Sequence, residues 1–254
     1  MKTIFTILVL SVITSAFASP QGVALEEQMA RRAGGHDNKS AQATLSAVFR
    51  LATPQGQVIS LQERNANLMV RPASTMKLFT GWMALQRGVR SDEFLSEMLH
   101  TSDNAKAEQS LRLLGGASAM TRYYRDAGLP MAQLRIVDGS GLSKSNRTNC
   151  HVQLELLNLI RQTPDYERFR SLLASPGEVG TLDDRLLEYQ GRLFGKTGTL
   201  STTIALTGYL ESPKGTLMFC VISEFFKNSW PAERARVDAV IRAKITELET
   251  SRYY

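Results

Sequence analysis

The chain has few residues of the kinds that hold metal ions or cross-link small folds. Its 254 residues include three histidines (His36, His100, His151), which are scattered, and two cysteines. Two isolated cysteines in a chain of this length are not a disulfide framework, and no metal or organic cofactor is expected. Cys220 lies in the apolar run 217–222 and is expected to be a small buried side chain, although an oxidising compartment would allow a bridge to Cys150.

The sequence also lacks internal repeats, long linkers, basic runs and any motif known to read nucleic acid. After the N-terminal segment, no stretch reaches the roughly 20 apolar residues needed to cross a bilayer. The formal charge of +6 suits a protein that works near anionic polymers or lipid surfaces. We therefore expect one domain, over residues 19–254, with no nucleic-acid partner and a monomeric state.

The N-terminus has the pattern of an export signal. Lys2 precedes an apolar segment at 4–13, and Ala16-Phe17-Ala18 is a small-x-small cleavage site. A membrane anchor is the alternative, but this apolar segment is shorter than a membrane span. Residues 1–18 are predicted to be a cleaved signal peptide, with Ser19 starting a periplasmic mature protein.

Hydrophobic periodicity predicts strands near both ends of the mature chain and helices between them. The expected strands are residues 43–52, 57–61, 192–196, 202–210 and 216–223. The expected helices are residues 23–32, 74–85, 92–99, 103–114, 118–127, 151–160 and 231–248. This order predicts a mixed α/β (α+β) fold, in which terminal helices flank a five-stranded antiparallel sheet and a helical lobe is inserted. The sheet part would comprise about 19–73 and 190–254, and the lobe about 74–189, with a cleft between them.

Ser74-Thr75-Met76-Lys77 pairs a nucleophile with a base. Residues i and i+3 share a helix face, so Lys77 is expected one turn beyond the Ser74 hydroxyl. A partly desolvated lysine can lose its proton near neutral pH and accept the hydroxyl proton. The free amide of Ser74 at the helix start could donate to an oxyanion. Taken alone, this motif is more often an ordinary helix start followed by a surface lysine.

Two further short motifs supply groups that would complete an acyl-transfer site. In Ser102-Asp103-Asn104, Ser102 could pass a proton to a leaving amine, while the Asn104 amide could hold a peptide carbonyl and Lys77. In Lys196-Thr197-Gly198-Thr199, an edge strand could align an extended peptide, and Gly198 would let it lie close to the backbone. Lys196 and the two threonine hydroxyls would bind a terminal carboxylate, and the amide of Thr199 would be the second oxyanion donor.

The three motifs and the residues around them resemble penicillin-binding protein 4 type D-alanyl-D-alanine carboxypeptidases and endopeptidases, peptidase family S13. The resemblance also includes Val137-Asp138-Gly139-Ser140-Gly141-Leu142-Ser143 and Gly180-Thr181-Leu182, and it covers most of the mature chain. It implies the penicillin-binding and β-lactamase-like transpeptidase fold. It also implies that the catalytic residues are Ser74, Lys77, Ser102, Asn104 and Lys196. The loop 138–143 is expected to be structural, and a direct role for Ser140 is a minor hypothesis.

One spacing differs from the larger members of that family. Lys77 and Ser102 are only 25 residues apart, so the long accessory insertion found there in larger relatives is missing. We expect a reduced serine DD-peptidase with a more open cleft. It would hydrolyse D-alanyl bonds of peptidoglycan stems and cross-links through an acyl-enzyme, as an endopeptidase with carboxypeptidase activity, and would bind β-lactams covalently.

Other functions are weighed against this one. A serine β-lactamase needs a second base for water, and the only weak match, Glu155-Leu156-Leu157-Asn158, lies in a helical run. A conventional serine hydrolase would need a histidine base and a G-x-S-x-G elbow, and Gly139-Ser140-Gly141 is not one. A catalytically inactive wall-binding homologue would be expected to lose a motif, whereas all three are intact.

Overall fold

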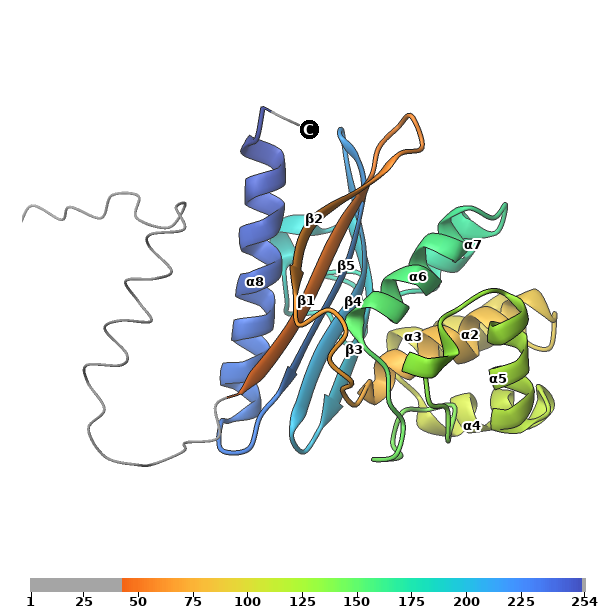
Figure 1. Cartoon of the computed structure of the whole chain (residues 1–254). Coiled ribbons are helices and arrows are strands. Elements are labelled where there is room, and N and C mark those ends of the chain that lie inside the picture. Colours follow the sequence, from red (N-terminus) through yellow and green to blue (C-terminus); the bar gives the residue numbers. More distant parts are fainter. Residues whose placement is uncertain (1–42, 253–254) are drawn as a thin grey trace, which may run out of the picture. The chain divides into compact units, whose positions relative to one another are not determined.

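The computed structural model describes residues 43–252, which form a sheet with helices on both faces (Figure 1). The strands are β1 (Thr44–Ala52), β2 (Val58–Arg64), β3 (Leu193–Leu200), β4 (Thr203–Ser212) and β5 (Gly215–Glu224). The α-helices are α2 (Met76–Gln86), α3 (Asp92–His100), α4 (Asn104–Leu113), α5 (Gly116–Asp126), α6 (Cys150–Arg161), α7 (Tyr166–Ser171) and α8 (Trp230–Thr250). Short 3-10 helices are η1 (Ala73–Thr75), η2 (Met131–Gln133) and η3 (Leu187–Tyr189).

The sheet is antiparallel and has the order β2-β1-β5-β4-β3. Three pairs of strands are hairpins, whereas β1 and β5 come from opposite ends of the described chain and pair along their length, with Val48 opposite Cys220. The predicted five-stranded antiparallel sheet is therefore confirmed. Because β3 is an edge strand, the side of its backbone opposite β4 pairs with no further strand among residues 43–252, and only Gly195 forms a bridge there, to Ala174.

Helix α8 covers one face of the sheet (Figure 1). Its buried residues Val237, Ile241 and Ile245 pack with strand residues such as Phe49 and Phe219. Apolar residues recur about every 3.6 positions along the helix and at every second position along the strands. Each element therefore contributes one apolar face to this core.

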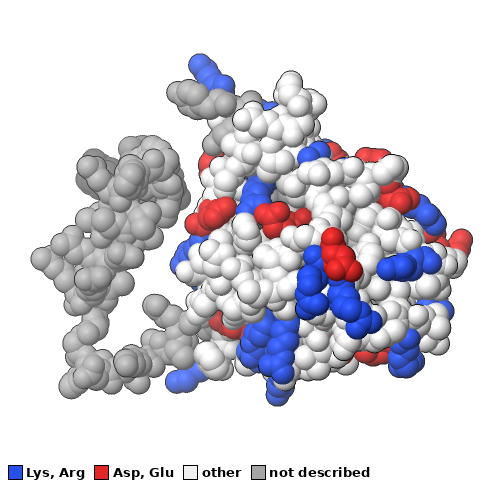
Figure 2. Space-filling view, turned by 45° about the vertical axis from the view of Figure 1, so that its right-hand side comes forward, with Lys and Arg blue, Asp and Glu red and all other residues white. Residues whose placement is uncertain are grey.

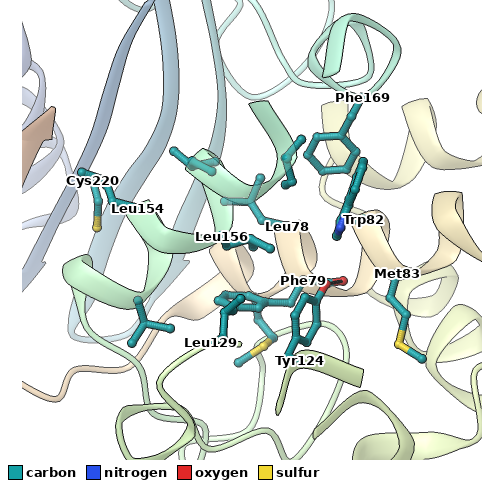
Figure 3. Packing of buried hydrophobic residues seen from close by; sticks show 14 of the residues in the cluster. Leu78, Phe79, Trp82, Met83, Tyr124, Leu129, Leu154, Leu156, Phe169 and Cys220 are labelled. Atoms are coloured by element: carbon teal, nitrogen blue, oxygen red, sulfur yellow. Dashed lines mark hydrogen bonds between the residues drawn. The ribbon is translucent and has the colours of Figure 1, made fainter. Parts of the chain in front are cut away.

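The opposite face is covered by α6, and helices α2 to α5 and α7 pack with it around a second and larger core. Aromatic rings meet edge to face within it: Phe79 and Tyr124 have centroids 5.3 Å apart, and Trp82 and Phe169 5.5 Å apart (Figure 3). Figure 3 also shows Leu154 beside the sheet. Helix α2 is buried along almost its entire length, as its run of large apolar residues predicts.

Several elements differ from their predicted extent. The helix expected from residue 74 starts with the 3-10 turn η1, and α7 was not predicted because it is a short, charged segment. Strand β3 continues to Leu200, beyond the expected end at 196, because its backbone pairs with β4 even where the side chains are not apolar. The helix expected at 23–32 lies outside the described residues. No helix in the span 43–252 is long and apolar enough to cross a membrane.

The two cysteines form a disulfide, so the expectation that Cys220 is an unpaired small side chain is wrong. The sulfur atoms of Cys150 and Cys220 are 2.07 Å apart. Cys220 points from β5 toward the larger core, and Cys150 is the first residue of α6, which packs against β5. The two residues are 70 positions apart in the chain, and only the packing of α6 on the sheet brings them together.

Candidate active site

Ser74 lies in a strained turn where β3 meets the start of α2. The preceding residue, Ala73, has a φ of 49°, which a residue with a Cβ adopts only when its surroundings enforce it. Two glycines make this possible. A Cβ on Gly141 would lie 1.7 Å from the carbonyl oxygen of Ala73, and one on Gly198 would lie 3.0 Å from the Ala73 Cβ. Two separate segments, the loop that contains Gly141 and the strand that contains Gly198, therefore pack closely against the residue before Ser74. The Ser74 side chain itself is partly exposed.

Lys77 joins two of the sequence motifs, as predicted. Its Nζ lies 3.0 Å from Ser74 Oγ, 2.7 Å from Asn104 Oδ1 and 2.8 Å from the backbone carbonyl oxygen of Ser140. The lysine side chain is completely buried. A buried ammonium ion loses its hydration, so this position favours the neutral amine.

Burial is the main influence on the pKa of Lys77 and lowers it from 10.5 to about 8. The carboxylates of Asp138, Glu108 and Asp103 oppose this effect, in that order, because they stabilise the ammonium form. The result is a lysine that exchanges its proton near neutral pH, as a general base must.

The loop 137–143 delivers the third contact of Lys77. Glu108 on α4 accepts hydrogen bonds from the backbone N–H groups of Gly139 (3.1 Å) and Ser140 (2.8 Å). Asp138 accepts from two later N–H groups of the loop, at 2.7 and 2.5 Å. These bonds fix the loop so that the Ser140 carbonyl points at Lys77. This loop is predicted from the sequence to be structural, and the role of its carbonyl was missed. The Asp-Gly-Ser-Gly run was the signal that could have indicated it.

The second motif forms the start of α4. Asp103 caps the helix by accepting a hydrogen bond from the Lys106 N–H at 2.9 Å, which leaves Asn104 in the first turn to reach Lys77. Ser102 has a φ of 65°, a second strained residue at the site. Its hydroxyl makes no hydrogen bond to any residue between 43 and 252, and its role in passing a proton to a leaving amine stays a prediction.

Strand β3 presents backbone N–H groups toward the site. The N–H of Gly195 donates to Ala174 rather than to β4, at 2.9 Å. Because N–H directions alternate along a strand, the N–H groups of Thr197 and Thr199 also point away from β4. Thr199 is exposed, and its role as an oxyanion donor stays a prediction.

Lys196, which is predicted to bind the terminal carboxylate of a substrate, lies on β3. Its side chain is completely buried, and its Nζ donates to the carbonyl oxygen of Thr197 at 3.0 Å. Burial and, to a smaller extent, the nearby Lys77 charge hold its pKa well below the ordinary value of 10.5. A carboxylate that arrived beside this lysine would favour its ammonium form.

A buried chain of polar side chains supports the nucleophile turn from the sheet. Thr207 on β4 donates to Gln153 Oε1 (2.6 Å), and Gln153 Nε2 donates to Thr75 Oγ1 (3.0 Å). Thr75 in turn donates to the carbonyl oxygen of Pro72 (2.7 Å). Both threonines and Gln153 are completely buried, so each bond is made away from water. This role of Gln153 was missed in the sequence, where a single glutamine among leucines gives no signal.

The glutamate named for the β-lactamase alternative makes its contacts outside this cluster. Glu155, the weak β-lactamase candidate, is held by Arg50 of β1 at 2.7 Å and faces away from Gln153 on α6. Residues 43–252 contain no group of three or more His, Cys, Asp or Glu side chains that could hold a metal ion.

With this geometry established, comparison with known proteins assigns a family. Residues 90–244, more than half of the chain, match the model of the D-Ala-D-Ala carboxypeptidase 3 (S13) family. The chain belongs to this family. The match includes the second and third motifs and the loop 137–143, and it begins after Ser74 and Lys77. The predicted S13 resemblance is confirmed.

The proteins similar to this chain differ in how much of their length they share with it. The chain is 31% identical over 168 residues to carboxypeptidase DacB of Mycolicibacterium smegmatis, a match covering 58% of this chain and 36% of that relative. Among solved structures, a predatory endopeptidase from Bdellovibrio bacteriovorus has a TM-score of 0.65 at 12% identity, covering 82% of this chain and 92% of that chain. A β-lactamase from Burkholderia ambifaria has a TM-score of 0.66 at 15% identity, covering 83% and 96%. These two structural matches confirm the predicted fold.

Proposed function

We propose that this S13 protein is an exported serine DD-peptidase that hydrolyses D-alanyl bonds of peptidoglycan through an acyl-enzyme on Ser74. The observation that carries the proposal is the buried Lys77 Nζ, 3.0 Å from Ser74 Oγ, with a pKa lowered to about 8. No metal or organic cofactor enters the reaction.

Acylation uses the geometry around Lys77. A neutral amine has two hydrogens and one lone pair. The carbonyl of Ser140 and Oδ1 of Asn104 can accept the two hydrogens, which turns the lone pair toward Ser74. Ser74 Oγ then attacks the carbonyl carbon of the D-alanyl bond while its proton moves to Lys77.

The remaining predicted residues complete the cycle in this proposal. The N–H groups of Ser74 and Thr199 hold the oxyanion of the tetrahedral intermediate. Ser102 gives its hydroxyl proton to the leaving amine as the C–N bond breaks, and it regains a proton from the Lys77 ammonium, which leaves Lys77 neutral again. Lys196, with the hydroxyls of Thr197 and Thr199, binds the terminal carboxylate of the substrate. Water then hydrolyses the ester and returns Ser74 to its starting state.

We further propose cleavage of cross-links as the main activity, with removal of terminal D-alanine beside it. An endopeptidase must admit a second peptide stem on the leaving-group side, whereas a carboxypeptidase needs room only for one D-alanine. Between Lys77 and Ser102 the chain forms the rest of α2 and the short helix α3, without an accessory domain that could cover the site. The Bdellovibrio endopeptidase of the same fold has been solved acylated by penicillin G, which supports β-lactams as covalent inhibitors here.

Export to the periplasm belongs to the same proposal. It rests on the predicted signal peptide at 1–18, which lies outside the described residues, and on the wall substrate that the family implies.

Two assays test this function. Intact-mass spectrometry after incubation with benzylpenicillin should show one adduct on the native protein and none on Ser74→Ala. Native enzyme should convert D-alanyl-linked muropeptide dimers to monomers, and Ser74→Ala should not. An adduct that persists in the variant overturns the nucleophile assignment, and loss of D-alanine from pentapeptides with dimers left intact overturns the endopeptidase assignment. Rapid turnover of nitrocefin would instead indicate a β-lactamase.

A further inference from the structure

A groove lies on the helical lobe, remote from the site described above. It has a volume of about 750 Å³ and is bounded by the C-terminal ends of α2 and α4 and by one side of α5. Arg87, just beyond α2, is thirteen residues after Ser74, which corresponds to roughly 20 Å along a helix. The groove is thus on the same lobe as the nucleophile but at the other end of its helix.

Two arginines line this groove and have no acidic partner. Arg87 and Arg122 are exposed, and neither forms an ion pair within the part of the chain that the structure describes. Arg87 lies over the ring of Tyr123, 5.5 Å from its centroid, a contact that holds the guanidinium at the groove wall. By contrast, Arg168 and Arg242 are both paired with carboxylates.

The charge around the groove is predominantly positive. A smaller adjoining hollow of about 350 Å³ shares Arg122 and adds Arg125, which is also unpaired in the described span. Among the residues that the structure describes, Asp126 is the one carboxylate that lines the groove, and it forms no ion pair with Arg122 one turn earlier. Figure 2, which brings the helical lobe forward, shows Lys and Arg side chains spread over the lower half of this face with fewer Asp and Glu between them.

The rest of the groove is apolar. Leu113 has 58% of its surface exposed, and Val89 and Leu114 lie beside it over the buried Met83. Guanidinium groups bind carboxylates through two parallel hydrogen bonds, and an apolar wall suits the methyl and methylene groups of short side chains. The combination fits a peptide that carries free carboxylates better than it fits a purely ionic polymer.

We propose that this groove binds a second peptide stem of peptidoglycan through its free carboxylate, separately from the stem being cleaved. The proposal rests on the proposed function, which makes the wall the substrate. A single contact between exposed charges is weak, but the wall repeats its stems many times. A second contact on the same polymer holds the enzyme on the wall and so raises the effective concentration of cross-links around the active site.

The test measures binding without cleavage. The Ser74→Ala protein is sedimented with purified sacculi stripped of secondary polymers, with and without Arg87→Ala and Arg122→Ala together. The double change should weaken binding by about tenfold or more, because both carboxylate contacts are lost. A matched control, Arg64→Ala with Arg234→Ala, removes the same charge from exposed residues of β2 and α8 and should change binding less than twofold.

Two further arms identify the ligand. Sacculi whose carboxylates are converted to amides should bind the Ser74→Ala protein equally well with and without the two arginine changes. With Ser74 intact, the double variant should be acylated by benzylpenicillin at the native rate. The groove does not bind stem carboxylates if the double variant sediments with sacculi as the Ser74→Ala parent does, or if it loses no more binding than the control pair. The same conclusion follows if the double variant and the parent also differ in binding to amidated sacculi. Arg122→Glu, a surface change, should weaken binding further. Failure of penicillin to acylate Ser74 would refute the proposed function while leaving the binding result readable.

Discussion

The rate of Ser74 acylation should follow the deprotonation of Lys77. At pH 7, a lysine with a pKa of about 8 is neutral in about one molecule in ten, against about one in three thousand for a pKa of 10.5. This difference, about 300-fold, corresponds to roughly 3 kcal/mol of activation free energy. In the proposed mechanism, burial of Lys77 would thus contribute a substantial part of the catalysis at neutral pH.

The direction of the pH dependence follows from the lowered pKa. The neutral form predominates above about pH 8 and is lost as the pH falls. We therefore expect the acylation rate constant to rise about fifty-fold from pH 6 to pH 8 and to level off near pH 9. The measurement is the first-order rate at saturating benzylpenicillin, because ligand affinity also depends on the protonation of Lys196.

A substitution separates base catalysis from simple charge. Lys77→Arg retains a cation, but a guanidinium does not deprotonate in a protein, so acylation should fall by several orders of magnitude at every pH. The reasoning is refuted if this variant acylates within about tenfold of native, or if the native rate is flat between pH 6 and 8.

Three other results are expected. Glu108→Gln keeps an acceptor for the loop amides but removes a charge that raises the pKa of Lys77, so the rise in acylation rate should move to lower pH; an unchanged profile would contradict this. Gln153→Met leaves two threonine hydroxyls without their amide partner, and urea unfolding should show a loss of about 1–3 kcal/mol together with slower acylation. Replacing Cys150 and Cys220 by alanine opens a loop closed over 70 residues and should lower the unfolding free energy by about 4 kcal/mol, whereas a drop below 1 kcal/mol would show that the bridge adds little.

Local patterns in the sequence predicted most of the fold. The helices around Leu78 and Leu156 and the strands around Phe49 and Phe219 follow from apolar spacing, because each buries one face in a core. Helix α7 was missed because six residues are too few for a periodic pattern. Contacts between distant segments were also missed, since the pairing of Cys150 with Cys220 depends on how α6 packs.

The side chains of the candidate site could be predicted from the sequence, whereas the backbone groups that contribute to it could not. Ser74, Lys77 and Asn104 were named from short motifs, and the structure brings them within hydrogen-bonding distance. The Ser140 carbonyl could not be singled out, because every residue carries one and only the fold decides which is aimed at Lys77. The burial of Lys196 likewise depends on tertiary packing around β3.

The disulfide has a consequence for how the protein withstands proteolysis. The bridge from Cys150 to Cys220 spans the exposed stretch around Val179, whose side chain is 90% exposed, and also the whole of β3. A protease that cut the chain once near Val179 would produce two fragments, one carrying Ser74 and Lys77 and the other carrying Lys196. The bridge would keep these fragments covalently joined, and the sheet pairing of β1 with β5 would hold them in register. A molecule cut there would retain both halves of its site.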